Sequence, residues 1–367
     1  MLHAVIMAGG TGTRFWPESR AKRPKQLLPM LGDETMIHKT VDRLGDLVAK
    51  KRLIISTTSE LAPSIAQELN DLPRGAILAE PCKRNTAPCI GLAAFMMVRD
   101  DPEAIMAVMP ADHVIETEER FREAIRYAAT LVEEDPERLV TFGIQPTYPA
   151  EGFGYIEQGE PIDSPAASEP GGAASPPTYF VKQFREKPDL ATAKGYLEAG
   201  RFTWNSGIFV WRAQTILDQL QRYEPEMYEH LSRIAEAIDS AQYEGVLKKE
   251  FAAIEGKSID YAVMERAEKV LVVEAPFDWD DVGSWRSLAR LKGTDDQGNT
   301  IDAKHVGIET TGTIVRGGGD HLIVTVGLED CIVVHTGDAT LVAHKDHEEA
   351  IRRVVDTLKE QGETKYL

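Results

Sequence analysis

Short apolar runs alternate with helical stripes over the first half of the chain. The runs are continuous, as expected of strands covered on both faces. Between them, Ile37, Val41, Leu44 and Val48 form one stripe at helical spacing, and 121–132 carry another. We therefore expect an α/β fold with a mostly parallel, doubly wound sheet and helices on both faces. The apolar runs are 5–7, 53–55, 76–78, 105–109 and 139–142.

The pattern changes after about residue 293. Four short strand-like runs, separated by glycine-containing turns, predict a small β-roll or partial β-helix. An amphipathic closing helix follows, with apolar residues from Ile351 to Leu358 on one face. We place the boundary within 291–302, which gives domains 1–292 and 293–367. The four runs are 313–315, 322–324, 331–334 and 340–342.

Two local signals refine this picture. Thr86 precedes Ala87 and Pro88 and is expected to cap a helix, because proline is tolerated in a first turn. Residues 161–178 are rich in Pro, Ala, Ser and Gly, and predict a flexible insert at the tip of a hairpin that joins 155–157 to 179–181. We expect a shortened insert to leave activity intact.

Charge and cysteine content exclude several classes of protein. The chain has 41 Lys and Arg against 59 Asp and Glu, a net charge of −18 that disfavours nucleic acid and anionic membranes as partners. No apolar run is long enough to cross a bilayer, and no secretory signal is evident. Three scattered cysteines are too few for a disulfide framework or a zinc site. A reduced, cytoplasmic enzyme is expected.

The loop after the first strand has three glycines and a local excess of cations. Glycine lets backbone N–H groups approach an anion closely. A dinucleotide fingerprint would need glycine near Phe15, and a P-loop would need Gly-Lys-Ser/Thr; both are absent. A different polyphosphate site, with Arg14 and Lys25 as cations, is one interpretation, and a solvated loop is the other. The cations within 8–25 are Arg14, Arg20, Lys22, Arg23 and Lys25.

Carboxylates follow in two places. Asp112 comes directly after the buried run 105–109, and Asp278, Asp280 and Asp281 stand within four residues. Like charges this close are costly unless a cation or a donor-rich ligand compensates them. A metal held by Asp112 and Asp281 would do so; a capped turn and an exposed acidic turn are the alternatives.

A third group suits a sugar phosphate. Glu186 and Asn205 can bind vicinal hydroxyls, and Lys187 can bind a phosphate. Gly154 would let the backbone reach a ring hydroxyl. Read alone, each of these segments is an ordinary loop.

Eight ordered motifs resemble those of the sugar-1-phosphate nucleotidyltransferases, specifically the mannose-1-phosphate guanylyltransferases. The similarity spans nearly the whole chain and includes VGLEDCIVV at 326–334. The motifs are GGTGTRFWPESRAKRPKQLL (9–28), EPCKRNTAPCIGLAA (80–94), MPADH (109–113), FGYIE (153–157), FREKPD (184–189), WNSGIF (204–209), SIDYAVMERA (258–267) and FDWDDVGSW (277–285).

The resemblance implies the reaction of GTP with mannose 1-phosphate to give GDP-mannose and diphosphate. It implies a Rossmann-like nucleotidyltransferase domain and a C-terminal partial left-handed β-helix. The β-roll could also be an oligomerisation module, which complements the enzyme interpretation and predicts a homodimer. Arg14 and Lys25 would stabilise the α-phosphate and the departing pyrophosphate, while Asp112 and Asp281 would hold Mg²⁺. The implied nucleotide-binding residues are Ala8, Gly9, Gly10, Thr11, Gly12, Thr13, Glu80, Asn85, Thr86 and Ala111. The implied sugar-phosphate residues are Gly154, Glu186, Lys187, Asn205, Gly207 and Asp280.

The implied chemistry is an in-line attack by a sugar-phosphate oxygen on the nucleotide α-phosphorus. The nucleophile is already anionic, so no general base is needed and His113 is given no catalytic role. Glu18 departs from the family pattern, where leucine is common. Another hexose 1-phosphate or nucleotide, or a silent regulatory subunit, remains the alternative. Without the isomerase domain of longer relatives, no phosphomannose isomerase activity is expected.

Overall fold

The computed structural model describes residues 1–10, 12–73, 75–162, 175–185 and 187–367, which form two compact units. Neither unit is continuous in sequence. The first consists of Met1–Gly9, Val41–Pro110 and Ile115–Trp279; the second consists of Gly10–Thr40, Ala111–Val114 and Asp280–Leu367. The second unit therefore includes most of the glycine loop and Asp112 as well as the C-terminal region. The domain boundary expected within 291–302 stays a prediction.

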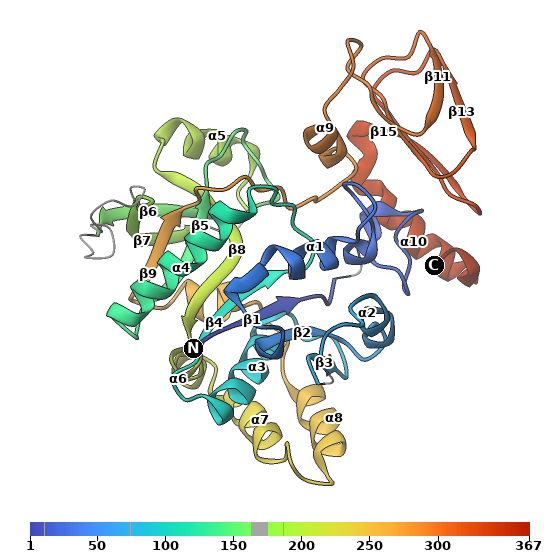
Figure 1. The fold of residues 1–367 in the computed structure, drawn as a ribbon. Coiled ribbons are helices and arrows are strands. Elements are labelled where there is room, and N and C mark those ends of the chain that lie inside the picture. The colour runs from blue at the N-terminus through green and yellow to red at the C-terminus, as the bar shows by residue number, and fades with distance from the viewer. Residues whose placement is uncertain (11, 74, 163–174, 186) are drawn as a thin grey trace. The chain divides into compact units, whose positions relative to one another are not determined.

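A mixed sheet forms the centre of the first unit (Figure 1). Within the described residues its strand order is β3-β2-β1-β4-β8-β5-β9-β7-β6. The predicted parallel pairing is present among β1 to β4 and between β5 and β9, whereas β6, β7 and β8 pair antiparallel. The strands are β1 (Leu2–Met7), β2 (Leu53–Thr58), β3 (Ile77–Glu80), β4 (Ile105–Pro110), β5 (Leu139–Ile144), β6 (Tyr155–Pro161), β7 (Thr178–Arg185), β8 (Phe202–Arg212) and β9 (Val270–Glu274).

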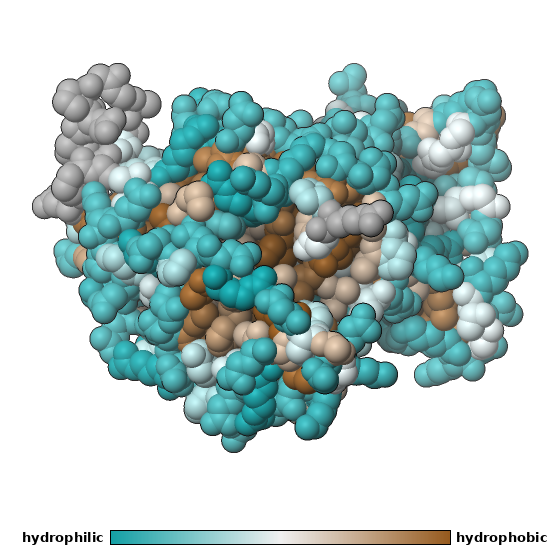
Figure 2. All heavy atoms as spheres, turned by 60° about the horizontal axis from the view of Figure 1, so that its bottom comes forward, coloured by the Kyte–Doolittle hydropathy of each residue, from teal (hydrophilic) through white to brown (hydrophobic). Residues whose placement is uncertain are grey.

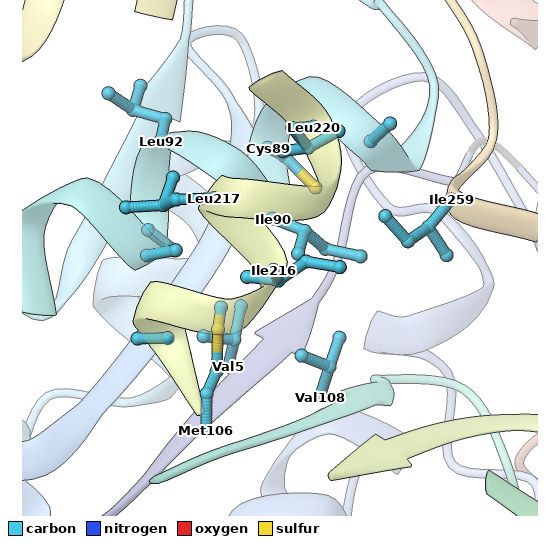
Figure 3. Packing of buried hydrophobic residues seen from close by; sticks show 14 of the residues in the cluster. Val5, Cys89, Ile90, Leu92, Met106, Val108, Ile216, Leu217, Leu220 and Ile259 are labelled. Carbon is cyan, nitrogen blue, oxygen red and sulfur yellow. The ribbon is translucent and has the colours of Figure 1, made fainter. Parts of the chain in front are cut away.

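Helices cover both faces of this sheet, as the continuous apolar runs predict. Figure 3 shows Val5, Met106 and Val108 of the sheet packed against Ile90 of α3 and Ile216 of α6. Helix α4 lies on the opposite face, where Phe121 meets Phe277 edge to face. The first unit's helices are α2 (Ala62–Glu68), α3 (Thr86–Asp100), α4 (Glu118–Glu134), α5 (Leu190–Ala199), α6 (Ala213–Tyr223), α7 (Pro225–Glu236), α8 (Tyr243–Ala253) and a π-helix (Asp260–Met264).

Two local expectations are wrong. The stripe over 37–48 is not one helix, because α1 (Met36–Arg43) ends before Gly45, whose positive φ of 47° starts a 3-10 turn. Leu44 and Val48 are nevertheless buried. Thr86 is not the cap of α3; Asn85 is the N-cap, and its side chain accepts a hydrogen bond from the Thr86 amide.

The second unit has the predicted β-roll and closing helix. Parallel pairs β10–β12, β12–β14 and β11–β13 stack as in a β-helix, and β15 closes the roll antiparallel to β14. The four predicted runs correspond to β12 to β15. The elements are α9 (Ser287–Lys292), β10 (Thr300–Asp302), β11 (Lys304–Ile308), β12 (Ile314–Gly317), β13 (Leu322–Val326), β14 (Cys331–His335), β15 (Thr340–His344), a 3-10 helix (Lys345–Ala350) and α10 (Ile351–Glu360).

The N-terminal loop and the C-terminal helix share the core of the second unit. Phe15 packs edge to face on Trp285, with ring centroids 5.0 Å apart. Ile351 and Val355, one turn apart on α10, are buried in the same cluster. The Trp16 indole N–H donates to the Tyr366 carbonyl at 2.9 Å. The glycine loop and the C-terminal helix are thus packed as one body.

The surface is largely hydrophilic in the view of Figure 2, in keeping with the charged-residue content of 27%. Within the described ranges, no helix combines the length and apolar character needed to span a membrane.

Candidate active site

A cavity of about 490 Å³ in the second unit collects the four residues predicted to be catalytic. We call it the Lys25 cavity. The cations Arg14, Lys25 and Arg352 line it together with two carboxylates and backbone of the glycine loop. Its lining consists of Gly12, Thr13, Arg14, Phe15, Lys25, Asp112, His113, Asp281, Gly283 and Arg352.

Lys25 lies between the two candidate metal ligands. Its ammonium group is 2.9 Å from the Asp112 carboxylate and donates to the Asp281 carbonyl at 2.6 Å. The Lys25 side chain is only 8% exposed, and a buried charge is costly unless it is paired and hydrogen-bonded, as it is here. Gly12 makes room for it: at φ +58°, a Cβ there would lie 2.4 Å from the Lys25 Cβ. Position 12 therefore requires glycine for two reasons: the positive φ of its own backbone, and the close packing of Lys25 against it.

Arg14, in the glycine loop, is held by a hydrogen bond to a backbone carbonyl. Its guanidinium donates to the Gly283 carbonyl at 2.7 Å, which ties the loop to the segment after Asp281. Its Nε lies 3.3 Å from the Glu349 carboxylate. Arg14 is therefore oriented before any ligand binds.

The two carboxylates of the Lys25 cavity differ in acidity. Burial disfavours ionisation of Asp112, but attraction by Lys25 and His113 outweighs it and lowers the pKa. Burial raises the pKa of Asp281, since Lys25 only partly offsets the added repulsion by Asp280 and Asp112. A cation between these carboxylates would relieve the penalty at Asp281.

The donor set fits a magnesium ion. Within the described ranges, no cluster of three or more His, Cys, Asp and Glu is arranged to hold a metal. Mg²⁺ is usually held by one or two carboxylates together with substrate phosphates and water. Asp112 and Asp281, facing one cavity, match that requirement.

Asp280 is occupied by other partners. Its two oxygens accept hydrogen bonds from Arg290 at 2.6 and 3.0 Å, and Oδ1 also accepts from the Val282 amide at 2.7 Å. The carboxylate thus fixes the turn that carries Asp281. Its contact with a sugar, expected from the resemblance, stays a prediction.

Glu80 is a buried carboxyl at the end of β3 in the first unit. It is 7% exposed, and Ser56 of β2 donates to its Oε1 at 2.7 Å. Burial raises the pKa of Glu80 to about 7, and the Ser56 hydrogen bond only partly opposes the rise. Glu80 therefore changes its charge near neutral pH.

Asn85 and Thr86, which follow Glu80 in the chain, have an unusual backbone conformation and a hydrogen bond to the segment before the π-helix. Asn85 has a backbone φ of 66°, which is uncommon for residues other than glycine. The Thr86 hydroxyl accepts from the Ile259 amide at 2.8 Å, next to the π-helix. Ala8 comes directly after β1, and its amide donates to the carbonyl of Ser56, the residue that holds Glu80, at 2.7 Å.

Asn205 and Gly207 share one network on β8. The Asn205 amide donates to Asp260 at 2.8 Å and accepts from the Gly207 amide at 3.1 Å, while its backbone N–H donates to the Gly154 carbonyl at 2.8 Å. Gly207 has φ +68°. The structure thus brings Gly154, Asn205 and Gly207 together.

The other predicted site residues are placed as follows. Ala111 is buried, and its carbonyl accepts from Thr40 at 3.3 Å. At Gly10, a Cβ would meet open space, as it would at Gly9. Lys187 is exposed with φ 39°. Thr11 and Glu186, together with 163–174 of the insert, lie outside the described residues.

Sequence reasoning gave no role to three residues that the structure associates with these groups. Ser56 holds Glu80, Asp260 holds Asn205, and Arg352 lines the Lys25 cavity. Only Asp260 had a signal, because it lies within the motif SIDYAVMERA. It is also part of a π-helix, a rare element that is frequent at functional sites.

Glu18, the departure from the family pattern, has a structural partner. Its carboxylate pairs with Arg316 of β12 at 2.8 Å, and Arg316 also donates to the Pro29 carbonyl at 2.9 Å. A charged residue at this position is therefore matched by a cation on the β-roll.

Comparisons with known proteins agree with this fold. The Nucleotidyl transferase family matches residues 3–297, and the MannoseP isomerase/GMP-like beta-helix domain matches 303–358. A protein named mannose-1-phosphate guanylyltransferase from Escherichia coli strain K12 is 38% identical over 98% of this chain and 74% of its own length. The xanthan biosynthesis protein XanB of Xanthomonas campestris is 38% identical over 98% of this chain and 73% of its own length.

A solved structure is similar over the whole chain. The crystal structure described as mannose-1-phosphate geranyltransferase from Thermus thermophilus has a TM-score of 0.83 and 32% identity, and the match covers 98% of this chain and 99% of the other. Enzymes of this family generally use a divalent metal. The chain belongs to the nucleotidyl transferase family, as an enzyme whose relatives over nearly all of this chain include proteins named mannose-1-phosphate guanylyltransferase.

Proposed function

We propose that this protein is a mannose-1-phosphate guanylyltransferase, which converts GTP and mannose 1-phosphate to GDP-mannose and diphosphate with Mg²⁺. The observation that carries the proposal is the Lys25 cavity, where Arg14 and Lys25, two carboxylates and the glycine loop converge. The names of relatives that match nearly all of this chain support the choice of substrates. The expected cytoplasmic location belongs to this proposal.

In this reaction, Arg14 and Lys25 stabilise charge on the α-phosphate and on the departing pyrophosphate. Both are already oriented by backbone carbonyls, so little reorganisation is needed when the ligand binds. Asp112 and Asp281 would hold Mg²⁺, which would supply charge neutralisation and orientation for the phosphates. No general base is required, because the attacking oxygen belongs to a phosphate.

The remaining contacts are assigned to the nucleoside and the sugar. Ionised Glu80 can accept both N1–H and N2–H of guanine, a pair of donors that adenine does not offer. The other nucleotide contacts are assigned to Ala8, Gly9, Gly10, Thr11, Gly12, Thr13, Asn85, Thr86 and Ala111. The sugar phosphate is assigned to Gly154, Glu186, Lys187, Asn205, Gly207 and Asp280.

A pyrophosphate-release assay tests this assignment. The four nucleoside triphosphates are each paired with mannose, glucose and galactose 1-phosphate, with and without Mg²⁺. GTP with mannose 1-phosphate should give the highest kcat/KM, and chelation should abolish release. A preference for ATP or for glucose 1-phosphate would overturn the specificity, and no release from any pair would favour the silent regulatory subunit.

We further propose that the protein is a homodimer joined through the β-roll. Strands β11 and β13 carry an outward row of exposed aliphatic residues, whereas Ile323 and Thr325 between them point inward. Extended apolar faces of this kind mark interaction sites. The exposed residues are Val306 (48%), Ile308 (54%), Leu322 (47%), Val324 (55%) and Val326 (61%).

Charge at the ends of this face favours a second copy as its occupant. Lys304 begins β11 and Glu309 follows it, so two antiparallel copies would bring each lysine to the other copy's glutamate. Sedimentation of Val324→Glu should give a monomer, with Lys248→Glu on α8 as a control that adds a carboxylate elsewhere. A wild-type monomer, or a dimer in Val324→Glu, would refute this interface.

A further inference from the structure

Arg352 brings a third cation to the Lys25 cavity from helix α10, beyond the β-roll. Neither the motifs nor the proposed reaction uses it. The cavity otherwise contains Arg14 and Lys25 against the carboxylates of Asp112 and Asp281. The two carboxylates already offset the charges of Arg14 and Lys25, so these cations cannot also neutralise a nucleoside triphosphate. A further cation would compensate the remaining phosphate charge.

The core of the second unit fixes the backbone that carries Arg352, whose side chain is half-exposed. Its neighbour Ile351 and Val355 one turn later are 2% and 8% exposed, packed in the cluster that contains Phe15 of the glycine loop. The preceding 3-10 helix is held by Arg286, which pairs with Asp346 at 2.9 Å and Glu348 at 3.4 Å. The start of α10 is therefore anchored on both sides of Glu349.

Glu349 lies between the two arginines of the cavity. One carboxylate oxygen is 3.3 Å from Arg14 Nε and the other is 3.6 Å from Arg352 Nε. The Glu349 side chain is 68% exposed, so water screens these contacts and they are weak. Arg14 Nε is buried and, within the described part of the chain, makes no hydrogen bond to Glu349 or to any other group. The Arg14 guanidinium is thus incompletely satisfied.

We propose that Arg352 binds the β- and γ-phosphates of the nucleotide and the pyrophosphate product, and that Glu349 takes the place of this phosphate charge when the cavity is empty. The proposal rests on the proposed function only in that the ligand is a nucleoside triphosphate. Binding phosphate at Arg14 and Arg352 displaces the exposed Glu349 carboxylate. The C-terminal helix is then part of the active site as well as of the β-roll domain.

Calorimetric titration of the whole protein with inorganic pyrophosphate and Mg²⁺ tests this assignment. Arg352→Ala should raise the Kd by about 10-fold, and Arg352→Lys should restore part of the loss. Arg353→Ala, the next residue on the exposed side of α10, is the matched control and should bind as the wild type does. Glu349→Gln should bind pyrophosphate about 3-fold more tightly, because the competing charge is removed.

Steady-state kinetics separate a phosphate contact from a structural role. Arg352→Ala should raise the KM for GTP with the KM for mannose 1-phosphate unchanged. An unchanged pyrophosphate Kd in Arg352→Ala, or a wild-type protein that binds no pyrophosphate, overturns the inference. If the wild type binds pyrophosphate through Arg352 but does not turn over GTP, the inference holds and the proposed function fails.

Discussion

In the second unit the candidate residues are mainly charged side chains whose opposite charges compensate one another. In the first unit fewer of them are charged, and hydrogen bonds hold them in place. Lys25 sits against Asp112 and the Asp281 carbonyl. Glu80, in contrast, meets the Ser56 hydroxyl. The difference suits the ligands proposed for each: phosphates and metal need fixed charges, while a base and a sugar are distinguished by hydrogen-bond donors and acceptors. Removing a charged side chain from the site in the second unit should therefore cause the largest loss of turnover.

The largest effect is expected for Asp281→Asn. Turnover should fall by about 100-fold or more, because one of the two proposed metal ligands loses its charge. The fold should survive, since asparagine keeps the oxygen that accepts the Gly283 amide at 3.2 Å. Steady-state kcat and a thermal melt measure the two effects.

Asp296→Asn is the control for this change, because Asp296 is exposed in the same unit and its charge lies outside the lining of the Lys25 cavity. Near-normal turnover in Asp281→Asn would show that the metal assignment is wrong.

A smaller effect is expected for Asp260→Asn in the first unit. The variant loses the charge that orients the Asn205 amide, so the KM for mannose 1-phosphate should rise by about 10-fold while kcat changes little. Asp260→Glu should recover part of the loss. Asp239→Asn, on the surface of the same unit, is the control. A fall in kcat without a change in KM would contradict the positioning role.

Glu80 offers a comparison within one residue, since its charge depends on pH. Burial raises its pKa from 4.5 to about 7, so the folded protein keeps a proton here that the unfolded chain releases between these values. The free energy of unfolding contributed by Glu80 therefore falls as pH rises from about 4.5 to about 7. The Tm difference between Glu80→Gln and wild type should rise over this range, and the rise should exceed any seen in the surface control Glu60→Gln.

Binding of guanine should respond in the opposite direction. Only ionised Glu80 can accept both guanine donors, so kcat/KM for GTP should increase by a few-fold as pH rises through about 7. This increase should be absent in Glu80→Gln. A wild-type profile without an inflection near this pH would remove Glu80 from guanine recognition.

The smallest effect is expected for the insert. Deletion of 163–174 should leave kcat and both KM values within about 2-fold of the wild type, because the segment carries none of the proposed site residues. A large loss of turnover in a deletion variant that stays folded would assign the insert a function.

The comparison of units also separates what sequence reasoning could reach from what it could not. Buried strands and the helix of 121–132 are predicted well, because hydrophobic periodicity is a local signal. The cap at Asn85 is missed, since it depends on a backbone conformation that composition does not reveal. The end of α1 at Arg43 is missed because Gly45 starts a turn inside an apolar stripe that stays buried.

The sequence by itself determined the strand and helix pattern, the β-roll, the nucleotidyltransferase family and the residue types suited to phosphate and metal. Tertiary structure alone decided that Arg352 lines the Lys25 cavity, that Gly12 makes room for Lys25, and that Arg290 occupies Asp280. These contacts join residues brought together by folding, and their energies depend on distance and burial. A motif supplies the side chains, but packing determines which charges they meet.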